Sequence, residues 1–173
     1  NIGEIAYMMN SLTYGWWEDD TLYKFVDPDH ISFAASPMEA RTRYNSAVIC
    51  GSVMLLSDSY KSSAMKELTK KLTSNTEINE IAKLGKAFRP VEGNVDEWAD
   101  NIYVLNTDDA FYIAAFNFDS GDKELTVNFE RAGLSSGVQY EVKDLWSDQI
   151  IRAQDEFKVR LMPSESTIYK IEK

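Results

Sequence analysis

Two carboxylates and the only histidine of the chain stand together in the segment Asp27-Pro28-Asp29-His30. Side chains of these types are suited to proton transfer, nucleophilic attack and hydrogen bonding to polar ligands. The run Tyr23 to Val26 before them favours a buried strand, because aromatic and β-branched side chains suit a pleated surface. Pairing should end at Pro28, which cannot donate to a β-ladder. The sequence thus predicts a strand that delivers carboxylates to its far edge, where active sites of parallel α/β folds lie.

A structural interpretation of the same acids stands beside the functional one. Asp27 and Asp29 also suit a proline-stiffened turn in which the carboxylates accept hydrogen bonds from backbone N–H groups. Two acids on one loop cannot reach a ligand from opposite faces. A lone histidine such as His30 is more often a hydrogen-bonding residue of a rim or core than a general base. From the residues alone, both interpretations stay open.

The amino-acid composition limits the classes of partner that the chain can bind. A formal net charge of -10, from 28 acidic and 18 basic residues, argues against nucleic acid and anionic membrane surfaces as partners. An uncharged partner such as a sugar is compatible with it. No stretch approaches the ~20 apolar residues of a membrane span. The single cysteine, Cys50, excludes an internal disulfide, has no metal-ligand spacing to His30, and is predicted to pack in a core.

The first half of the chain alternates helical periodicity with short apolar runs. Ser36-Pro37-Met38-Glu39 predicts a capped helix start with a capping box. The run Ser52 to Leu56 predicts a strand buried on both faces, and Asp58 beyond it a cap of the next helix. Apolar stripes and stop signals predict helices over residues 4–14, 37–50, 62–72 and 76–85. This alternation implies a pair of parallel strands.

Tryptophans mark two further candidate positions. Trp16 and Trp17 follow the first helix, where they suit either stacking on a sugar ring or packing at the helix end. Because tryptophan is highly buried on average, packing is favoured. Trp146 is likewise predicted to lie in a core and not to serve as a carbohydrate platform.

The second half of the chain has a periodicity of two. The composition changes at Phe88 to Trp98, where Arg89 to Gly93 is predicted to be a linker. Beyond it, short alternating runs are separated by turn residues. Such a pattern is typical of an antiparallel β-sandwich. The predicted strands are 101–105, 110–118, 123–129, 137–142, 150–153, 156–162 and 167–171.

In its order of parts, the chain resembles the C-terminal end of melibiase-type α-galactosidases and α-N-acetylgalactosaminidases. These are retaining glycoside hydrolases built as a TIM barrel followed by an antiparallel β-sandwich. The motifs that carry the resemblance are Asp27-Pro28-Asp29, Leu55-Leu56-Ser57-Asp58, and Tyr140-Glu141-Val142-Lys143-Asp144-Leu145-Trp146-Ser147. The resemblance implies an α/β plus all-β chain: the last βα units of a (β/α)8 barrel in residues 1–88, and the sandwich in residues 89–173.

The resemblance also implies roles for the candidate site residues. Asp29 and His30 would line the sugar pocket, with Asp27 framing the loop. Many members have Met where this chain has His30 and Asn where it has Val26, so the preferred sugar does not transfer from the family.

The resemblance implies that the catalytic carboxylates lie outside this chain. Retaining glycosidases need a nucleophilic carboxylate and a protonated acid about 5–5.5 Å apart across the glycosidic bond. The family takes these from its fourth and sixth barrel strands, so we expect both upstream of Asn1, with no catalytic residue in this chain and no activity of the chain alone. The expected parent protein is an exo-α-glycosidase acting on terminal galactosyl-type sugars without metal or cofactor, in a secreted or periplasmic location. The alternative is a non-catalytic carbohydrate-binding or scaffolding module.

The partners expected for the chain are a glycoside or oligosaccharide substrate and the remainder of the barrel. An incomplete barrel leaves strand edges unpaired and apolar helix faces bare. We therefore expect the chain to dimerise, to aggregate, or to pack its helices against the sandwich.

Overall fold

Helices dominate the first half of the chain, as its periodicity predicts. The computed structural model describes residues 1–51, 53–92 and 98–173. The side chain of Ser36 accepts a hydrogen bond from the Glu39 N–H, and that of Asn75 from the Ile78 N–H, so both predicted caps are confirmed. The predicted capping box is only half formed, because the Glu39 carboxylate binds Arg43 instead. The helices are α1 (Ile2–Tyr14), α2 (Pro37–Ile49), α3 (Ser63–Thr73) and α4 (Thr76–Lys83).

Two very short strands form a parallel pair beside these helices. His30 of β1 (His30–Ile31) is in register with Leu55 of β2 (Leu55–Leu56). The prediction of parallel strands is therefore confirmed, but the predicted strand at Tyr23 to Val26 is wrong. That segment is irregular, and Tyr23 and Phe25 are 57% and 53% exposed.

The predicted burial of the second strand on both faces is also wrong, because both residues of β2 are exposed. Ser52, the first residue of that predicted strand, lies outside the described residues. Apolar strand residues become buried only when neighbouring strands and helices cover them. Within the part of the chain that the structure describes, β1 and β2 pair with each other and with no third strand.

Asp58 joins the two loops that follow these strands. Its carboxylate accepts hydrogen bonds from the Ser32 hydroxyl at 2.8 Å and the Phe33 N–H at 2.5 Å. The prediction that Asp58 caps the next helix is wrong, since Ser62 is the N-cap of α3. The Asp58 carboxylate thus binds donors that follow β1 and not the first N–H groups of α3.

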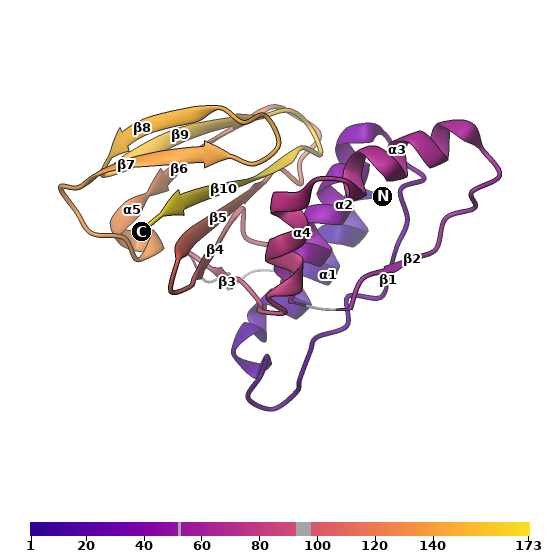
Figure 1. Ribbon diagram of the computed structural model, residues 1–173, viewed down its shortest axis with the longest axis horizontal. Helices are drawn as coiled ribbons and strands as arrows, with labels where there is room; N and C mark the ends of the chain where they lie inside the picture. The colour runs from indigo at the N-terminus through magenta and orange to yellow at the C-terminus, as the bar shows by residue number, and fades with distance from the viewer. Residues whose placement is uncertain (52, 93–97) are drawn as a thin grey trace.

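The second half forms two antiparallel sheets, as predicted (Figure 1). In the described residues, one sheet has the order β3-β4-β5-β10-β7-β8, and the second pairs β6 with β9. The short helix α5 (Phe129–Ala132) follows β6. The strands are β3 (Arg89–Pro90), β4 (Ile102–Asn106), β5 (Ala110–Phe116), β6 (Lys123–Asn128), β7 (Gln139–Asp144), β8 (Ile150–Gln154), β9 (Glu156–Leu161) and β10 (Ser166–Glu172).

The linker predicted between the two halves contains an unpredicted strand. Arg89 and Pro90 form β3 and pair with Val104 and Tyr103 of β4. Proline is tolerated there because β3 lies at the edge of its sheet. Gly93, the last residue of the predicted linker, lies outside the described residues.

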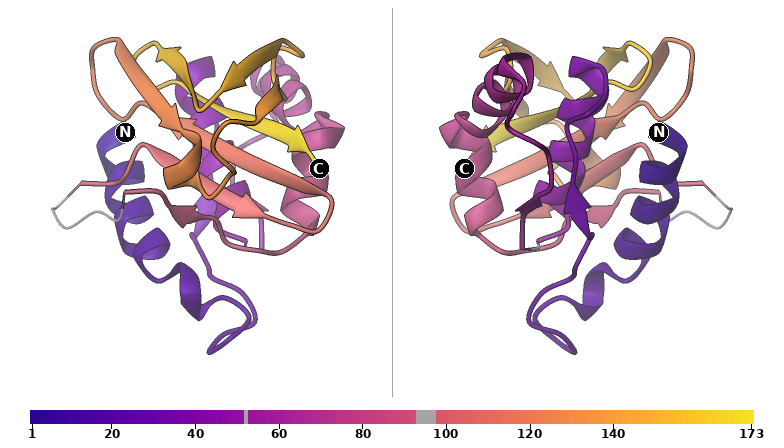
Figure 2. Two further views of the ribbon diagram at one scale, coloured as in Figure 1. Left: turned by 90° about the vertical axis from the view of Figure 1, so that its left-hand side faces the viewer. Right: turned by 90° about the vertical axis from the view of Figure 1, so that its right-hand side faces the viewer.

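The larger sheet is covered on both faces, which gives the molecule three layers (Figures 1 and 2). Along β4, Ile102 and Val104 belong to the core shared with β6 and β9, whereas Tyr103 and Leu105 belong to the core shared with the helices. This alternation follows from the period of two along a strand. The helices thus pack against the sandwich, which is one of the three outcomes expected for bare helix faces. Cys50 lies in the helical core, as predicted.

Polar contacts fix α2 to the sandwich. The amide of Asn45, which is fully buried, donates to the Ser166 hydroxyl at 2.9 Å and accepts from the Trp146 indole N–H at 3.1 Å. Arg41 lies over the Trp146 ring, 5.8 Å from its centroid, and pairs with Glu165. Trp146 therefore packs at the helix–sheet boundary, with its indole N–H already bonded. None of the described helices is long and apolar enough to span a membrane.

Candidate functional site

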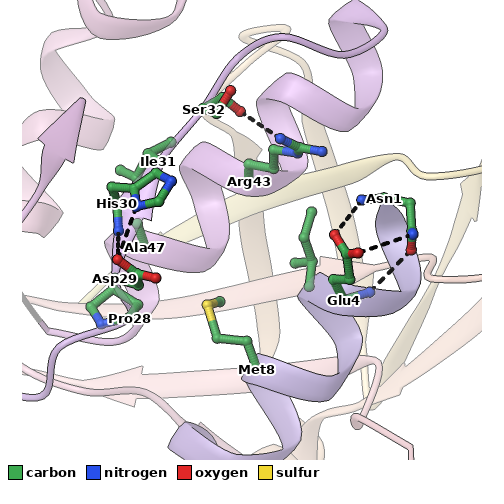
Figure 3. A pocket seen from close by; sticks show the side chains of 11 residues that line it. Asn1, Glu4, Met8, Pro28, Asp29, His30, Ile31, Ser32, Arg43 and Ala47 are labelled. Carbon is green, nitrogen blue, oxygen red and sulfur yellow. Dashed lines mark hydrogen bonds and ion pairs between the residues drawn. The ribbon is translucent and has the colours of Figure 1, made fainter. Parts of the chain in front are cut away.

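A hollow of about 290 Å³ lies between α1, α2 and the segment 28–32 (Figure 3). Apolar side chains of Ile5, Met8, Ile31 and Ala47 contribute to its lining. Its polar lining includes two of the predicted site residues, Asp29 and His30, together with Glu4, Ser32 and Arg43. The predicted acid and the histidine therefore come together at one hollow.

The Asp29 carboxylate and the His30 imidazole form a hydrogen-bonded pair. Asp29 Oδ1 accepts from the His30 backbone N–H at 2.7 Å and lies 2.9 Å from His30 Nδ1. Asp29 has a φ of +69°, a left-handed conformation that Asp tolerates better than most residues. Because Nδ1 is held by the carboxylate, Nε2 is the ring nitrogen left for a ligand.

Asp27 holds the turn that carries this pair. Its Oδ1 accepts a hydrogen bond from the Asp29 N–H at 2.9 Å. This is the proline-stiffened turn set out above as the structural interpretation. Asp27 is absent from the lining of the hollow, whereas Asp29 belongs to the turn and to the hollow at once.

The position of Asp29 relative to the strand differs from the prediction. Asp29 lies just before β1, at its amino end, and not beyond the carboxyl end of a strand over residues 23–26. The turn at Asp27 to Asp29 interrupts the extended backbone, so pairing begins only at His30. The prediction that Asp29 lies at the carboxyl end of a strand is therefore wrong, although its carboxylate lines a hollow.

The electrostatics of the pair favour a charged carboxylate. The backbone N–H of His30, and then its side chain, hold the pKa of Asp29 below its ordinary value. Both donors stabilise the ionised form. Since the Asp29 side chain is 84% exposed, a ligand can reach it, and Asp29 offers acceptor oxygens and not an acidic proton.

Arg43 is a lining residue that the sequence analysis missed. Its guanidinium donates to the Ser32 carbonyl oxygen at 2.9 Å and to the Glu39 carboxylate at 2.7 Å. Arg43 thereby ties the segment after His30 to α2. In the sequence, the spacing of Glu39 and Arg43 predicts only an ion pair on a helix face, so nothing there pointed to the hollow.

Trp16 and Trp17 lie away from this hollow, in a 3₁₀ turn after α1. They are 40% and 55% exposed, so the favoured prediction that they pack at the helix end is wrong. Packing would require a neighbouring apolar surface over the turn. Among the described residues, there is no group of three His, Cys, Asp or Glu side chains placed to hold a metal ion.

Solved structures that share this fold include several glycoside hydrolases. The chain superposes on α-galactosidase I of Mortierella vinacea with a TM-score of 0.70 and 14% identity, over 84% of this chain and 38% of that one. It superposes on the α-galactosidase of Saccharomyces cerevisiae solved with raffinose (TM-score 0.66, 11% identity, 85% and 47% coverage). A β-L-arabinopyranosidase of Geobacillus stearothermophilus gives a TM-score of 0.66 at 16% identity, covering 96% and 43%. The chain thus spans less than half the length of these structures.

The family comparison agrees with the fold. Residues 93–171 match the family model described as the alpha galactosidase C-terminal beta sandwich domain. No curated protein matches the sequence. The resemblance of the chain to the C-terminal portion of melibiase-type glycoside hydrolases is thereby confirmed.

Proposed function

We propose that the chain is the C-terminal portion of a retaining exo-α-glycosidase that removes terminal galactosyl-type sugars. In this proposal, residues 1–88 form the last part of a TIM-barrel domain and residues 89–173 the sandwich that supports it. The observation that carries the proposal is the Asp29–His30 pair at the edge of a hollow with an apolar lining. An ionised carboxylate and a free imidazole nitrogen are suited to sugar hydroxyls, and apolar side chains to the C–H face of a sugar ring.

The size of the hollow agrees with one sugar ring. Its volume of about 290 Å³ lies near the lower limit of ligand sites. In the complete enzyme, Asp29 and His30 would form one wall, with the remaining walls supplied by the rest of the barrel. The exposed apolar residues Tyr23, Phe25, Leu55 and Leu56 would pack against those missing strands.

The catalytic carboxylates belong, in this proposal, to the remainder of the barrel. A general acid must be protonated at the working pH, and the lowered pKa of Asp29 keeps that carboxyl ionised. Asp27 offers no alternative, since its carboxylate accepts from the Asp29 N–H and does not line the hollow. Asp29 and His30 are therefore assigned to substrate binding. The chain alone is expected to be catalytically inactive.

The single histidine gives a direct test of the wall. Galactose should shift the ring proton signals of His30, the only histidine of the chain, in a saturable NMR titration. Asp29→Asn should weaken this binding at least about tenfold, because it removes a charged acceptor. Asp108→Asn, an exposed acid in the β4–β5 turn, is the matched control and should leave it unchanged. If galactose causes no saturable shift of the His30 ring proton signals, the proposal is overturned.

A further inference from the structure

A second hollow lies beyond the carboxyl end of α1, whereas the hollow with the Asp29–His30 pair contacts the helix between its start and Met8. It has a volume of about 440 Å³ and is lined by Trp16, Trp17, Asp19, Asp20, Thr21, Lys86, Ala87 and Leu105. The first hollow contacts Asn1, Glu4, Ile5 and Met8 of the same helical region. From Met8 to its end at Tyr14, α1 rises about 9 Å, and the two hollows share no lining residue.

The turn that carries the two indole rings is held in place from several sides. The Glu18 carbonyl oxygen accepts hydrogen bonds from the backbone N–H groups of Thr21, Leu22 and Tyr23 at 3.0–3.2 Å. Asp19 Oδ2 accepts from the Ala87 N–H at 2.8 Å, which ties the turn to the chain that enters β3. The rings are thus displayed by a braced turn and not by a free loop, which lowers the ordering cost of binding.

The chemistry of the lining favours a neutral polyhydroxylated ligand. Indole rings offer flat apolar surfaces for the C–H face of a pyranose. Asp20 supplies acceptor oxygens, and so does the Thr21 hydroxyl, whose proton is donated to the Trp17 carbonyl oxygen, whereas Lys86 supplies donors. Both signs of charge are present, and Asp20 is already paired with Lys24 at 2.9 Å, so neither an anion nor a cation is favoured. A volume of about 440 Å³ suits a mono- or disaccharide.

From these observations we propose that Trp16 and Trp17, with Asp20, Thr21 and Lys86, form a second saccharide-binding site, remote from the Asp29–His30 wall. Its ligand is a neutral mono- or disaccharide whose ring stacks on the exposed indoles. This site needs no catalytic group. It would hold a glycan near the enzyme while the first site takes a terminal sugar.

The test uses the indole N–H signals of the four tryptophans during NMR titrations of the whole chain with galactose and with lactose. Saturable shifts are expected at Trp16 and Trp17, and they should persist in Asp29→Asn. Trp17→Ala should weaken this binding at least about tenfold, whereas Trp17→Phe, which keeps an aromatic ring, should retain most of it.

Trp98→Ala is the matched control, because Trp98 is 45% exposed but does not line the hollow. It should leave the binding unchanged, and circular dichroism checks that each variant is folded. Two outcomes overturn the proposal. In one, neither sugar shifts the Trp16 and Trp17 signals, as expected if the rings only pack against another part of a longer protein. In the other, Asp29→Asn abolishes the shifts, which would place binding in the first hollow.

Discussion

At the scale of single residues, the placement of Asp29 is governed by its neighbours on the same turn. Asp27 fixes its backbone, and His30 supplies two donors to its carboxylate. These short-range contacts need no other part of the chain. Under the proposed function, the pair would keep this geometry in the complete barrel, and the carboxylate oxygens would face a ligand in the hollow.

The titration of Asp29 tests this arrangement. Its pKa should lie below the ordinary 3.8, measured by carbon NMR of the carboxyl group. Because the folded-state pKa is lowered, the ionised carboxylate stabilises the turn above its ordinary pKa, and this contribution is lost as pH falls through the lowered value. In His30→Ala the pKa should stay below 3.8, since the backbone N–H is the larger cause. A pKa above 3.8 in that variant would contradict the geometry.

Gly51 is a second residue whose environment fixes its type. It has a φ of +68°, and a Cβ there would lie 2.5 Å from the Ala87 nitrogen. Gly51→Ala should lower the free energy of unfolding by at least about 2 kcal/mol, from backbone strain and a clash with backbone atoms. Urea denaturation measures this loss.

Gly85→Ala is the matched control for Gly51→Ala. Gly85 has a φ of +59°, but no other residue comes within 4 Å of the place that a Cβ would take. Its alanine variant should cost only about 1–2 kcal/mol, from the backbone conformation alone. Equal losses at the two glycines would show that the contact with Ala87 is unimportant.

At the scale of helices and strands, local signals predicted most of the fold. Capping residues such as Ser36 and Asn75 located helix starts, and alternation within runs such as Glu156 to Met162 located strands. These features depend on the residues themselves and their nearest neighbours. The second parallel strand lies within its predicted run, but the first was mislocated, because the apolar residues of the predicted strand, Tyr23 and Phe25, need partners beyond their own segment to be buried.

The candidate site was predicted only in part for a related reason. Asp29 and His30 are adjacent in sequence, so their pairing was accessible from a motif. Arg43 reaches the same hollow from α2, and its contact with Ser32 depends on how the helix packs. Such a long-range contact leaves no periodicity or spacing in the sequence.

The join between α2 and the sandwich depends on Asn45. Asn45→Ala should lower the free energy of unfolding by about 2–3 kcal/mol, because the Trp146 indole N–H and the Ser166 hydroxyl both lose a buried partner. Ser46→Ala is the control on the same helix, since Ser46 is also buried but bonds only to the Thr42 carbonyl within α2. Its loss should stay below about 1 kcal/mol. Urea unfolding that leaves the two variants equally stable would contradict the role of Asn45.

At the scale of the whole molecule, apolar side chains of β2 and of the segment before β1 remain uncovered. Leu55 and Leu56 are exposed beside the unpaired edges of β1 and β2, and Leu22, Tyr23 and Phe25 are exposed in the segment that precedes β1. Exposed apolar patches next to strand edges promote association. We infer that the rest of a barrel covers this surface in the parent protein.

Self-association of the isolated chain tests this inference. Sedimentation should show a molar mass that increases with concentration, together with binding of a hydrophobic dye. Leu55→Lys should reduce both, because a charge on the strand edge opposes pairing. The control is Val138→Lys, which places the same charge on the sandwich surface, where Val138 is 43% exposed. This variant should change neither the molar mass nor the dye binding. A monomer at every concentration, without dye binding, would contradict the inference.

The central claim is that this chain binds a sugar while its parent protein supplies the reacting carboxylates elsewhere. The most direct measurement is hydrolysis of an aryl α-galactoside by the purified chain, alone and joined to the preceding barrel residues of its parent. We expect no turnover by the chain alone and turnover by the joined protein, with sugar binding weakened by Asp29→Asn. If the chain alone hydrolyses the substrate and Asp29→Asn abolishes this turnover, the proposed function is wrong, because Asp29 would then be the catalytic carboxylate.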